Sequence, residues 1–135
     1  MEKLSKFAAL AVAASVLAIP AVAPAAAPET KDSGPCFFVS QWKSWKAVDD
    51  HTILLRVNQN DIYRVGVTGG ADQLRGPGMF LLSKSHGNSV CSHLDLELSA
   101  ADTSSSFKSP LIARSLVKLS PAEVASIPPK DLPSR

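Results

Sequence analysis

The sequence predicts an all-β domain: a small curled or barrel-like antiparallel sheet of five to six strands with a short C-terminal helix. Two observations predict this fold class. Short runs rich in β-branched and aromatic residues recur between residues 36 and 119, and turn-forming residues separate them. A helix-start pattern then follows the last run. The main alternative is an α+β fold with a longer helix near 69–78.

Residues 1–27 have the pattern of a secretory signal peptide. A charged start precedes an apolar run over 7–23, and small residues follow it. Pro20 interrupts the run, which is shorter than the roughly 20 residues that a spanning helix needs. We therefore expect cleavage near 23–27 rather than a retained anchor, with no stable membrane span afterwards. Several Ala-x-Ala sites leave the exact bond open.

The remainder divides into a polar linker at 28–35, a single β-rich domain at 36–129 and a tail at 130–135. The linker has no apolar periodicity, and Pro128 and Pro129 end the last predicted helix. After removal of the signal peptide, roughly 108 residues remain, which is enough for one domain with one modest core.

The charge of the chain disfavours some classes of partner. The whole sequence has 14 basic and 12 acidic side chains, and loss of Lys3, Lys6 and Glu2 with the signal peptide leaves 12 and 11. A nearly neutral domain gives no electrostatic reason to expect nucleic acid or an anionic membrane as a partner. Lys43 and Lys46 are too few to form a basic block.

The two cysteines, Cys36 and Cys91, predict a disulfide between the first strand and a later one. An exported chain matures in an oxidising compartment, where such a bond persists. The pair encloses 54 residues, and closing a loop of this size stabilises a fold by about 4 kcal/mol. A redox or metal-binding pair is the alternative, but Cys-x-x-Cys spacing and neighbouring histidines at ligand spacing are absent.

The clearest pair of strands is a hairpin formed by 52–57 and 62–67. Both runs are rich in β-branched residues, and polar residues over 58–61 lie between them. The turn predicts that Arg56 faces Tyr63 across the hairpin, as a stacking pair or, less favoured, as part of an anion site. Both faces of the hairpin contain apolar residues, so we expect partial cover on each side.

Other elements follow from shorter patterns. Further strands are predicted at 36–39, 79–83, 89–99 and 111–119, and the glycine-rich stretch 69–78 is predicted to be a loop. In 89–99, strict alternation predicts that Leu94, Leu96 and Leu98 face the core while His93, Asp95 and Glu97 face water. The C-terminal helix begins at Ser120-Pro121-Ala122-Glu123, a capping box with proline at the first helical position.

The order of these motifs resembles a family of small exported proteins of unknown function from Gram-negative bacteria. The matching residues, within about 36–129, are Cys36-Phe37, Val48-Asp49-Asp50-His51-Thr52-Ile53, Tyr63-Arg64-Val65, Val90-Cys91-Ser92, Leu94-Asp95 and Leu119-Ser120-Pro121-Ala122-Glu123. The resemblance implies export and a compact domain, and it supplies no activity. Members often carry two further cysteines near the positions of Ala71 and Leu111, and their joint absence here implies the loss of one bridge.

Candidate functional residues have competing structural interpretations. The candidate binding surface comprises Trp42, Trp45, Asp49, Asp50, Arg56 and Tyr63. The tryptophans suit a platform for a sugar, although core packing is favoured. The aspartates suit a carboxylate pair, although turn chemistry is favoured. His93, Asp95 and Glu97 have ligand-like spacing for a metal, although the wet face of a strand needs no ligand.

These observations favour a non-enzymatic binding or structural module of the cell envelope, located in the periplasm, whose partner is an envelope protein or glycan. The alternative is an envelope enzyme or inhibitor that uses Asp49, Asp50, His93 and Asp95. A pocket that joins those four side chains would favour the enzyme. We expect no cofactor, no metal and no catalytic residues, because the histidines lie in separate predicted elements.

Overall fold

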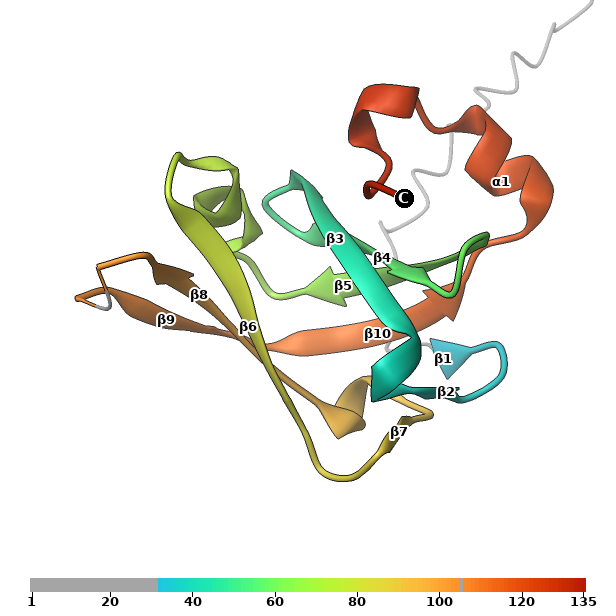
Figure 1. The fold of residues 1–135 in the computed structure, drawn as a ribbon, viewed down its shortest axis with the longest axis horizontal. Helices are drawn as coiled ribbons and strands as arrows, with labels where there is room; N and C mark the ends of the chain where they lie inside the picture. Colours follow the sequence, from blue (N-terminus) through green and yellow to red (C-terminus); the bar gives the residue numbers. More distant parts are fainter. Residues whose placement is uncertain (1–31, 105) are drawn as a thin grey trace, which may run out of the picture.

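The structure is a computed structural model that describes residues 32–104 and 106–135 (Figure 1). The predicted signal peptide lies outside the described residues. Within them, ten strands form three open sheets, and one short α-helix, α1 (Pro121–Ser126), follows the last strand. The predicted all-β fold with a short C-terminal helix is confirmed, with more and shorter strands than the sequence indicated.

The largest sheet contains the predicted hairpin. Its strand order is β1 (Asp32–Ser33), β10 (Ala113–Lys118), β5 (Asp61–Val67), β4 (Thr52–Val57) and β3 (Trp42–Asp49). The β1–β10 pair is parallel, and the other pairs are antiparallel. Strand β3 is therefore at one edge of this sheet, and it contains both tryptophans.

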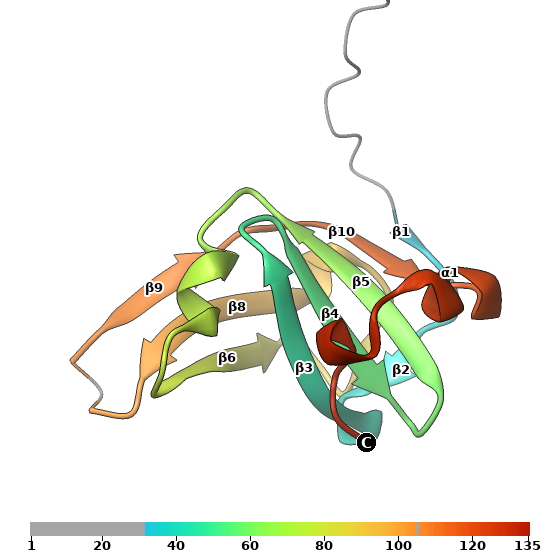
Figure 2. The same cartoon turned by 90° about the horizontal axis from the view of Figure 1, so that it is seen from above.

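A second sheet has the order β6 (Met79–Ser85), β8 (Leu96–Asp102) and β9 (Lys108–Leu111). The two-stranded third sheet pairs β2 (Phe37–Phe38) with β7 (Ser89–Val90). Only Ile112 separates β9 from β10, so the chain passes directly from the second sheet into the first, and the two sheets lie at an angle (Figure 2). The predicted single strand 111–119 is wrong, because the chain changes sheets at this point.

Four short 3-10 helices lie outside the strands; three connect strands, and the fourth follows α1. They are η1 (Val39–Gln41), η2 (Ala71–Arg75), η3 (His93–Asp95) and η4 (Pro129–Asp131). The region near 69–78 holds only the five residues of η2, which differs from the longer helix of the α+β alternative.

The hairpin has a register that differs by one residue from the predicted one. Val57 faces Asp61, so Arg56 faces Ile62 and Tyr63 faces Leu55. The turn contains three residues, and Asn58 adopts the left-handed conformation with φ of 54°. A three-residue turn shifts every pair by one position relative to the predicted turn, and this separates Arg56 from Tyr63.

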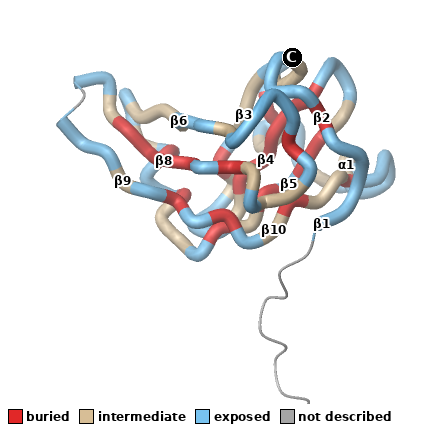
Figure 3. Tube along the Cα trace, turned by 90° about the horizontal axis from the view of Figure 1, so that it is seen from below, coloured by how far each residue is buried: buried red, intermediate tan, exposed pale blue. Residues whose placement is uncertain are grey.

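Both faces of the hairpin are covered, as the sequence predicted. One face contributes Ile53, Leu55 and Val65 to the main core between the two larger sheets, where the trace is mostly buried (Figure 3). The opposite face contributes Leu54 and Ile62 to a smaller cluster. That cluster is completed by Leu119 and by the partly buried Val48, Val124, Ile127 and Leu132. The C-terminal segment therefore packs as a cover over the outer face of the sheet.

The prediction of one strand over 89–99 is wrong. Leu96 and Leu98 are buried in β8, but Leu94 is 74 % exposed in η3. The carboxylate of Asp95 accepts hydrogen bonds from the backbone N–H groups of Cys91 and Ser92 at 2.8 and 2.9 Å. The bond from Ser92, together with the Ser92 side chain as an acceptor, forms a capping box, which begins a helical turn and interrupts the alternation.

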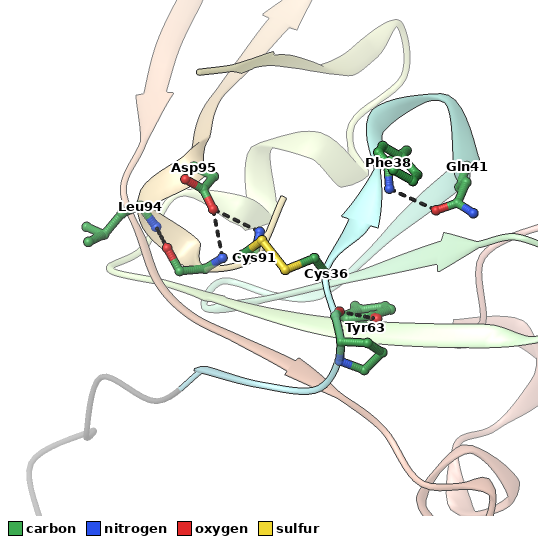
Figure 4. Close-up of a disulfide and its surroundings, with 9 residues drawn as sticks. Cys36, Phe38, Gln41, Tyr63, Cys91, Leu94 and Asp95 are labelled. Atoms are coloured by element: carbon green, nitrogen blue, oxygen red, sulfur yellow. Dashed lines mark hydrogen bonds between the residues drawn. A yellow bond between two sulfur atoms is a disulfide. The ribbon is translucent and has the colours of Figure 1, made fainter. Parts of the chain in front are cut away.

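The predicted disulfide is confirmed. Cys36 precedes β2 and Cys91 follows β7, and their Cα atoms are 4.2 Å apart (Figure 4). The bond therefore closes one end of the two-stranded sheet. In the part of the chain that the structure describes, no helix has the length and apolar character needed to cross a membrane.

Candidate anion-binding surface

The adjacent aspartates Asp49 and Asp50 hold a turn together. Asp49 Oδ1 accepts a hydrogen bond from the backbone N–H of His51 at 2.8 Å. Asp50 Oδ1 accepts one from the N–H of Gly70 at 2.8 Å, and Gly70 has a left-handed φ of 88°. The carboxylates thus fix the β3–β4 turn and attach it to the loop before η2. This geometry supports the turn interpretation over a free carboxylate pair.

His93 and Asp95 lie at a different place in the fold. His93 Nδ1 is 2.8 Å from a carboxylate oxygen of Asp32, and only 12 % of the His93 side chain is exposed. Hydrogen bonds from the N–H groups of Cys91 and Ser92 lower the pKa of the Asp95 carboxyl below its ordinary value. The Asp95 carboxylate therefore stabilises the start of η3. The prediction that His93 faces water is wrong, because its side chain is largely buried.

The four residues of the enzyme alternative are used in two separate local structures. Asp49 and Asp50 accept hydrogen bonds from His51 and Gly70. His93 bonds Asp32, and Asp95 accepts from the N–H groups of Cys91 and Ser92. Among the described residues, no three or more His, Cys, Asp or Glu side chains are grouped as a metal ion would require.

Both tryptophans lie in β3, and each is half-buried against the main core. Trp42 Nε1 donates a hydrogen bond to the carbonyl oxygen of Ser44 at 3.0 Å. Each indole therefore has a packing role, as the sequence favoured, and each retains some surface that a ligand can reach. Trp45 lines a hollow.

Arg56 and Tyr63 do not stack on each other. The Tyr63 ring packs against Phe37 with ring centroids 4.8 Å apart, and its hydroxyl donates to the carbonyl oxygen of Pro35 at 2.8 Å. Burial, and to a lesser extent the charge of Asp61, raise the pKa of the Tyr63 hydroxyl. Arg56 faces Ile62 and points to the opposite face of the sheet.

The structure brings together cations that the sequence does not show as a group. The first hollow, named here the Trp45 hollow, has a volume of about 540 Å³. Its lining residues are Trp45, Lys46, Ala47, Leu74, Arg75, Lys130 and Asp131. Three cationic residues thus line one hollow together with Trp45 and a single acidic residue, although Arg75 also bonds Asp72 at 3.1 Å.

The second hollow, named here the Arg56 hollow, has a volume of about 470 Å³. It is lined by Lys43, Ser44, Arg56, Asn58, Gln59, Asn60, Ser134 and Arg135, and no acidic side chain is among them. Hydrogen bonds from Arg56 to Pro133 and from Ser44 to Ser134 hold the C-terminal segment against β3 and β4. The end of the chain crosses these strands in Figure 2.

Sequence reasoning named Trp45 and Arg56 but missed the grouping of the cations, because they come from four segments. Lys43 and Lys46 are in β3, Arg56 is in β4, Arg75 is in η2, and Lys130 and Arg135 are in the C-terminal segment. The nearly neutral composition conceals the group, since net charge says nothing about where the charges lie.

Comparisons with protein-family models, with curated proteins and with solved structures find no match to this chain.

Proposed function

We propose that this protein is an exported, non-enzymatic binding module of the bacterial cell envelope, and that the Trp45 hollow binds an anionic glycan. The leader-like pattern of residues 1–27 and the Cys36–Cys91 disulfide support maturation in the periplasm. The observation that carries the binding proposal is a hollow lined by the half-buried Trp45 and by three cationic residues.

An indole and a group of cations together suit a glycan that bears carboxylates. The apolar face of a sugar ring packs on an aromatic face, and cations attract the carboxylates. Lys46, Arg75 and Lys130 supply the positive charge; Asp131 is the acidic residue in the lining, and Asp72 pairs with Arg75. Peptidoglycan has both sugars and carboxylates and is the envelope polymer that we expect to bind.

We also propose that the chain belongs to the family that it resembles. Relatives often have cysteines near the positions of Ala71 and Leu111. Both residues are buried in the main core here, and a Cβ atom added to Gly70 would lie 3.2 Å from Leu111 Cδ2. The close approach of these two segments supports a bridge at this place in relatives. The alternative, an enzyme or inhibitor using Asp49, Asp50, His93 and Asp95, has less support, because those carboxylates hold turns.

The test is binding of the mature protein to purified peptidoglycan, measured by co-sedimentation and by fluorescence. A Trp42→Phe background leaves Trp45 as the single indole. We expect peptidoglycan to change Trp45 emission, and Lys46→Gln with Lys130→Gln to abolish co-sedimentation.

The matched control is Lys84→Gln with Lys108→Gln, which removes the same charge from the second sheet. We expect this control to sediment with peptidoglycan as the parent does. Equal binding by the two double variants, or an unchanged Trp45 emission spectrum, would contradict the proposal.

A further inference from the structure

Arg56 is a buried cation without an acidic partner among the described residues. The residue is 7 % exposed, and no carboxylate of those residues forms an ion pair with its guanidinium. A buried charge is costly unless hydrogen bonds and an opposite charge compensate for it. Here backbone carbonyl oxygens accept its hydrogen bonds, and no acidic side chain of the described residues lines the hollow around it.

The guanidinium of Arg56 has unused hydrogen-bond donors. Its Nε and Nη2 donate to the carbonyl oxygen of Pro133 at 3.0 and 2.9 Å, and Nη1 donates to that of Gln59 at 2.7 Å. Arginine has five N–H donors in one plane, so these bonds leave two. An anion that reaches Arg56 through the hollow can accept from those two groups.

The other residues that line the Arg56 hollow also favour an anion, because they supply cations and hydrogen-bond donors. Lys43 and Arg135 add two cations, and the side chains of Asn58, Gln59 and Asn60 add amide donors. The volume of about 470 Å³ is in the range of small-molecule sites. Planar guanidinium donors match a planar carboxylate well.

A hollow of about 470 Å³ with both apolar and charged lining residues adjoins this site and shares Arg56, Asn60 and Arg135 with it. Its remaining lining residues are Asp61, Lys118, Leu119, Pro121, Val124, Ala125 and Leu132. Lys118 and Asp61 neutralise each other, with their charged atoms 3.3 Å apart. The hollow therefore suits an uncharged hydrocarbon group attached to the anion.

We propose that the Arg56 hollow binds the carboxylate of an aliphatic carboxylic acid, whose hydrocarbon chain lies in the adjoining hollow between β5 and α1. Among the described residues, this site shares no lining residue with the Trp45 hollow, and the proposal does not depend on glycan binding. Failure of the peptidoglycan experiment would leave it intact.

The test is calorimetric titration of the mature protein with octanoate, acetate and inorganic phosphate as probes. Octanoate should bind at least about tenfold more tightly than acetate, because each buried methylene adds to the affinity. Lys43→Gln should weaken octanoate binding by about two- to fivefold, as expected for loss of a partly exposed charge. Lys84→Gln, which removes a lysine from β6, is the matched control and should bind as the parent does.

A second variant tests the hydrocarbon part separately. Ala125→Trp fills the adjoining hollow from the exposed surface of α1 and should reduce octanoate affinity to that of acetate. Equal affinities for octanoate and acetate in the parent protein, or phosphate binding as tight as that of octanoate, would overturn the proposal. No measurable octanoate binding would also overturn it. Arg56→Lys is not used alone, because Arg56 also holds Pro133.

Discussion

At the scale of single residues, several aspartates accept hydrogen bonds from backbone N–H groups, most of them in turns and loops. Asp32 accepts from the backbone N–H of Leu116 at 2.9 Å, and Asp102 accepts from that of Phe107 at 3.1 Å. Asp49, Asp50 and Asp95 bond backbone N–H groups in the same way. A carboxylate that accepts from the backbone stabilises a turn. Side chains that suggested an acid–base site from their sequence spacing therefore have a structural role.

The role of Asp95 predicts a pH-dependent effect of its removal. Asp95→Ala should lower the free energy of unfolding by about 0.5–2 kcal/mol at pH 7, because the N–H groups of Cys91 and Ser92 lose their acceptor. The folded-state pKa of Asp95 is lowered, so its contribution exists above the unfolded-state pKa near 3.8. It disappears as the pH falls through the folded-state pKa.

Urea denaturation of the parent and variant proteins at pH 7 and at a pH of about 2 is the measurement. The difference between the two proteins should shrink at the lower pH. Glu97→Ala, at an exposed position of β8, serves as the control and should cost under about 0.5 kcal/mol. An Asp95→Ala variant as stable as the parent at pH 7 would contradict the role assigned to this carboxylate.

At the scale of elements, the chain between β7 and β8 shows how a local cap competes with a hydrophobic pattern. Leu94, Leu96 and Leu98 alternate as strand residues do, but the Ser92–Asp95 capping box turns 93–95 into a helical turn. Leu94 is consequently 74 % exposed, while Leu98 is 1 % exposed. Two leucines that look equivalent in sequence thus have opposite environments.

Paired alanine substitutions measure this difference directly. Leu98→Ala should lower the free energy of unfolding by about 2–5 kcal/mol, because it leaves a cavity in the main core. Leu94→Ala should change it by less than about 0.5 kcal/mol, because the side chain is already in water. Thermal and urea melts of the two variants are the check. Similar losses in both would mean that η3 is a strand, as the alternation predicted.

The elements also show what the sequence can and cannot predict. Residue composition predicted the hairpin of β4 and β5, because the preference for strands is local. The register depends on the conformation of Asn58, which composition does not specify, and the prediction missed by one position. The break at Ile112 was missed because an apolar run does not show where a chain changes sheets.

The candidate site could be predicted only in part for the same reason. Trp45 stood out by residue type, and it lines a hollow together with its neighbour Lys46. Arg75 and Lys130 join them only because η2 and η4 pack beside β3. No local pattern contains that arrangement, since tertiary contacts between distant segments create it.

At the scale of the whole molecule, the sheets stay open, and connections between them hold the fold together in place of a complete barrel. The β9–β10 passage joins the two larger sheets, and the C-terminal segment covers Leu54 and Ile62 on the outer face. Cys36–Cys91 links the start of the domain to the chain after β7. A domain of this size has a modest core, so such long-range connections matter for its stability.

Loss of the disulfide should therefore have a large effect. Cys36→Ser with Cys91→Ser should lower the free energy of unfolding by about 2–5 kcal/mol, because the 54 enclosed residues gain freedom in the unfolded chain. Thiol titration of the denatured, unreduced parent protein should find no free thiol. Two free thiols per chain would contradict the bond, and an unchanged melt of the variant would contradict its contribution.

The close approach of Gly70 to Leu111 predicts that a second bridge can be introduced, and this tests the proposed family membership. Ala71→Cys with Leu111→Cys should form a disulfide, because both positions are buried in the main core and the chain at Gly70 approaches Leu111 closely. The new loop would enclose residues 72–110, and its closure should stabilise the oxidised over the reduced variant by about 4 kcal/mol.

The comparison is made within one variant, since loss of the Leu111 side chain alone destabilises the core. Urea melts of the oxidised and the selectively reduced double variant are therefore measured together, with thiol titration to count bridges. Leu111→Cys alone, which cannot form the second bridge within one chain, controls for the lost side chain. If the double variant keeps two free thiols under oxidising conditions, then η2 and β9 do not approach as the structure describes. The proposed kinship with proteins that carry both cysteines would lose its structural support.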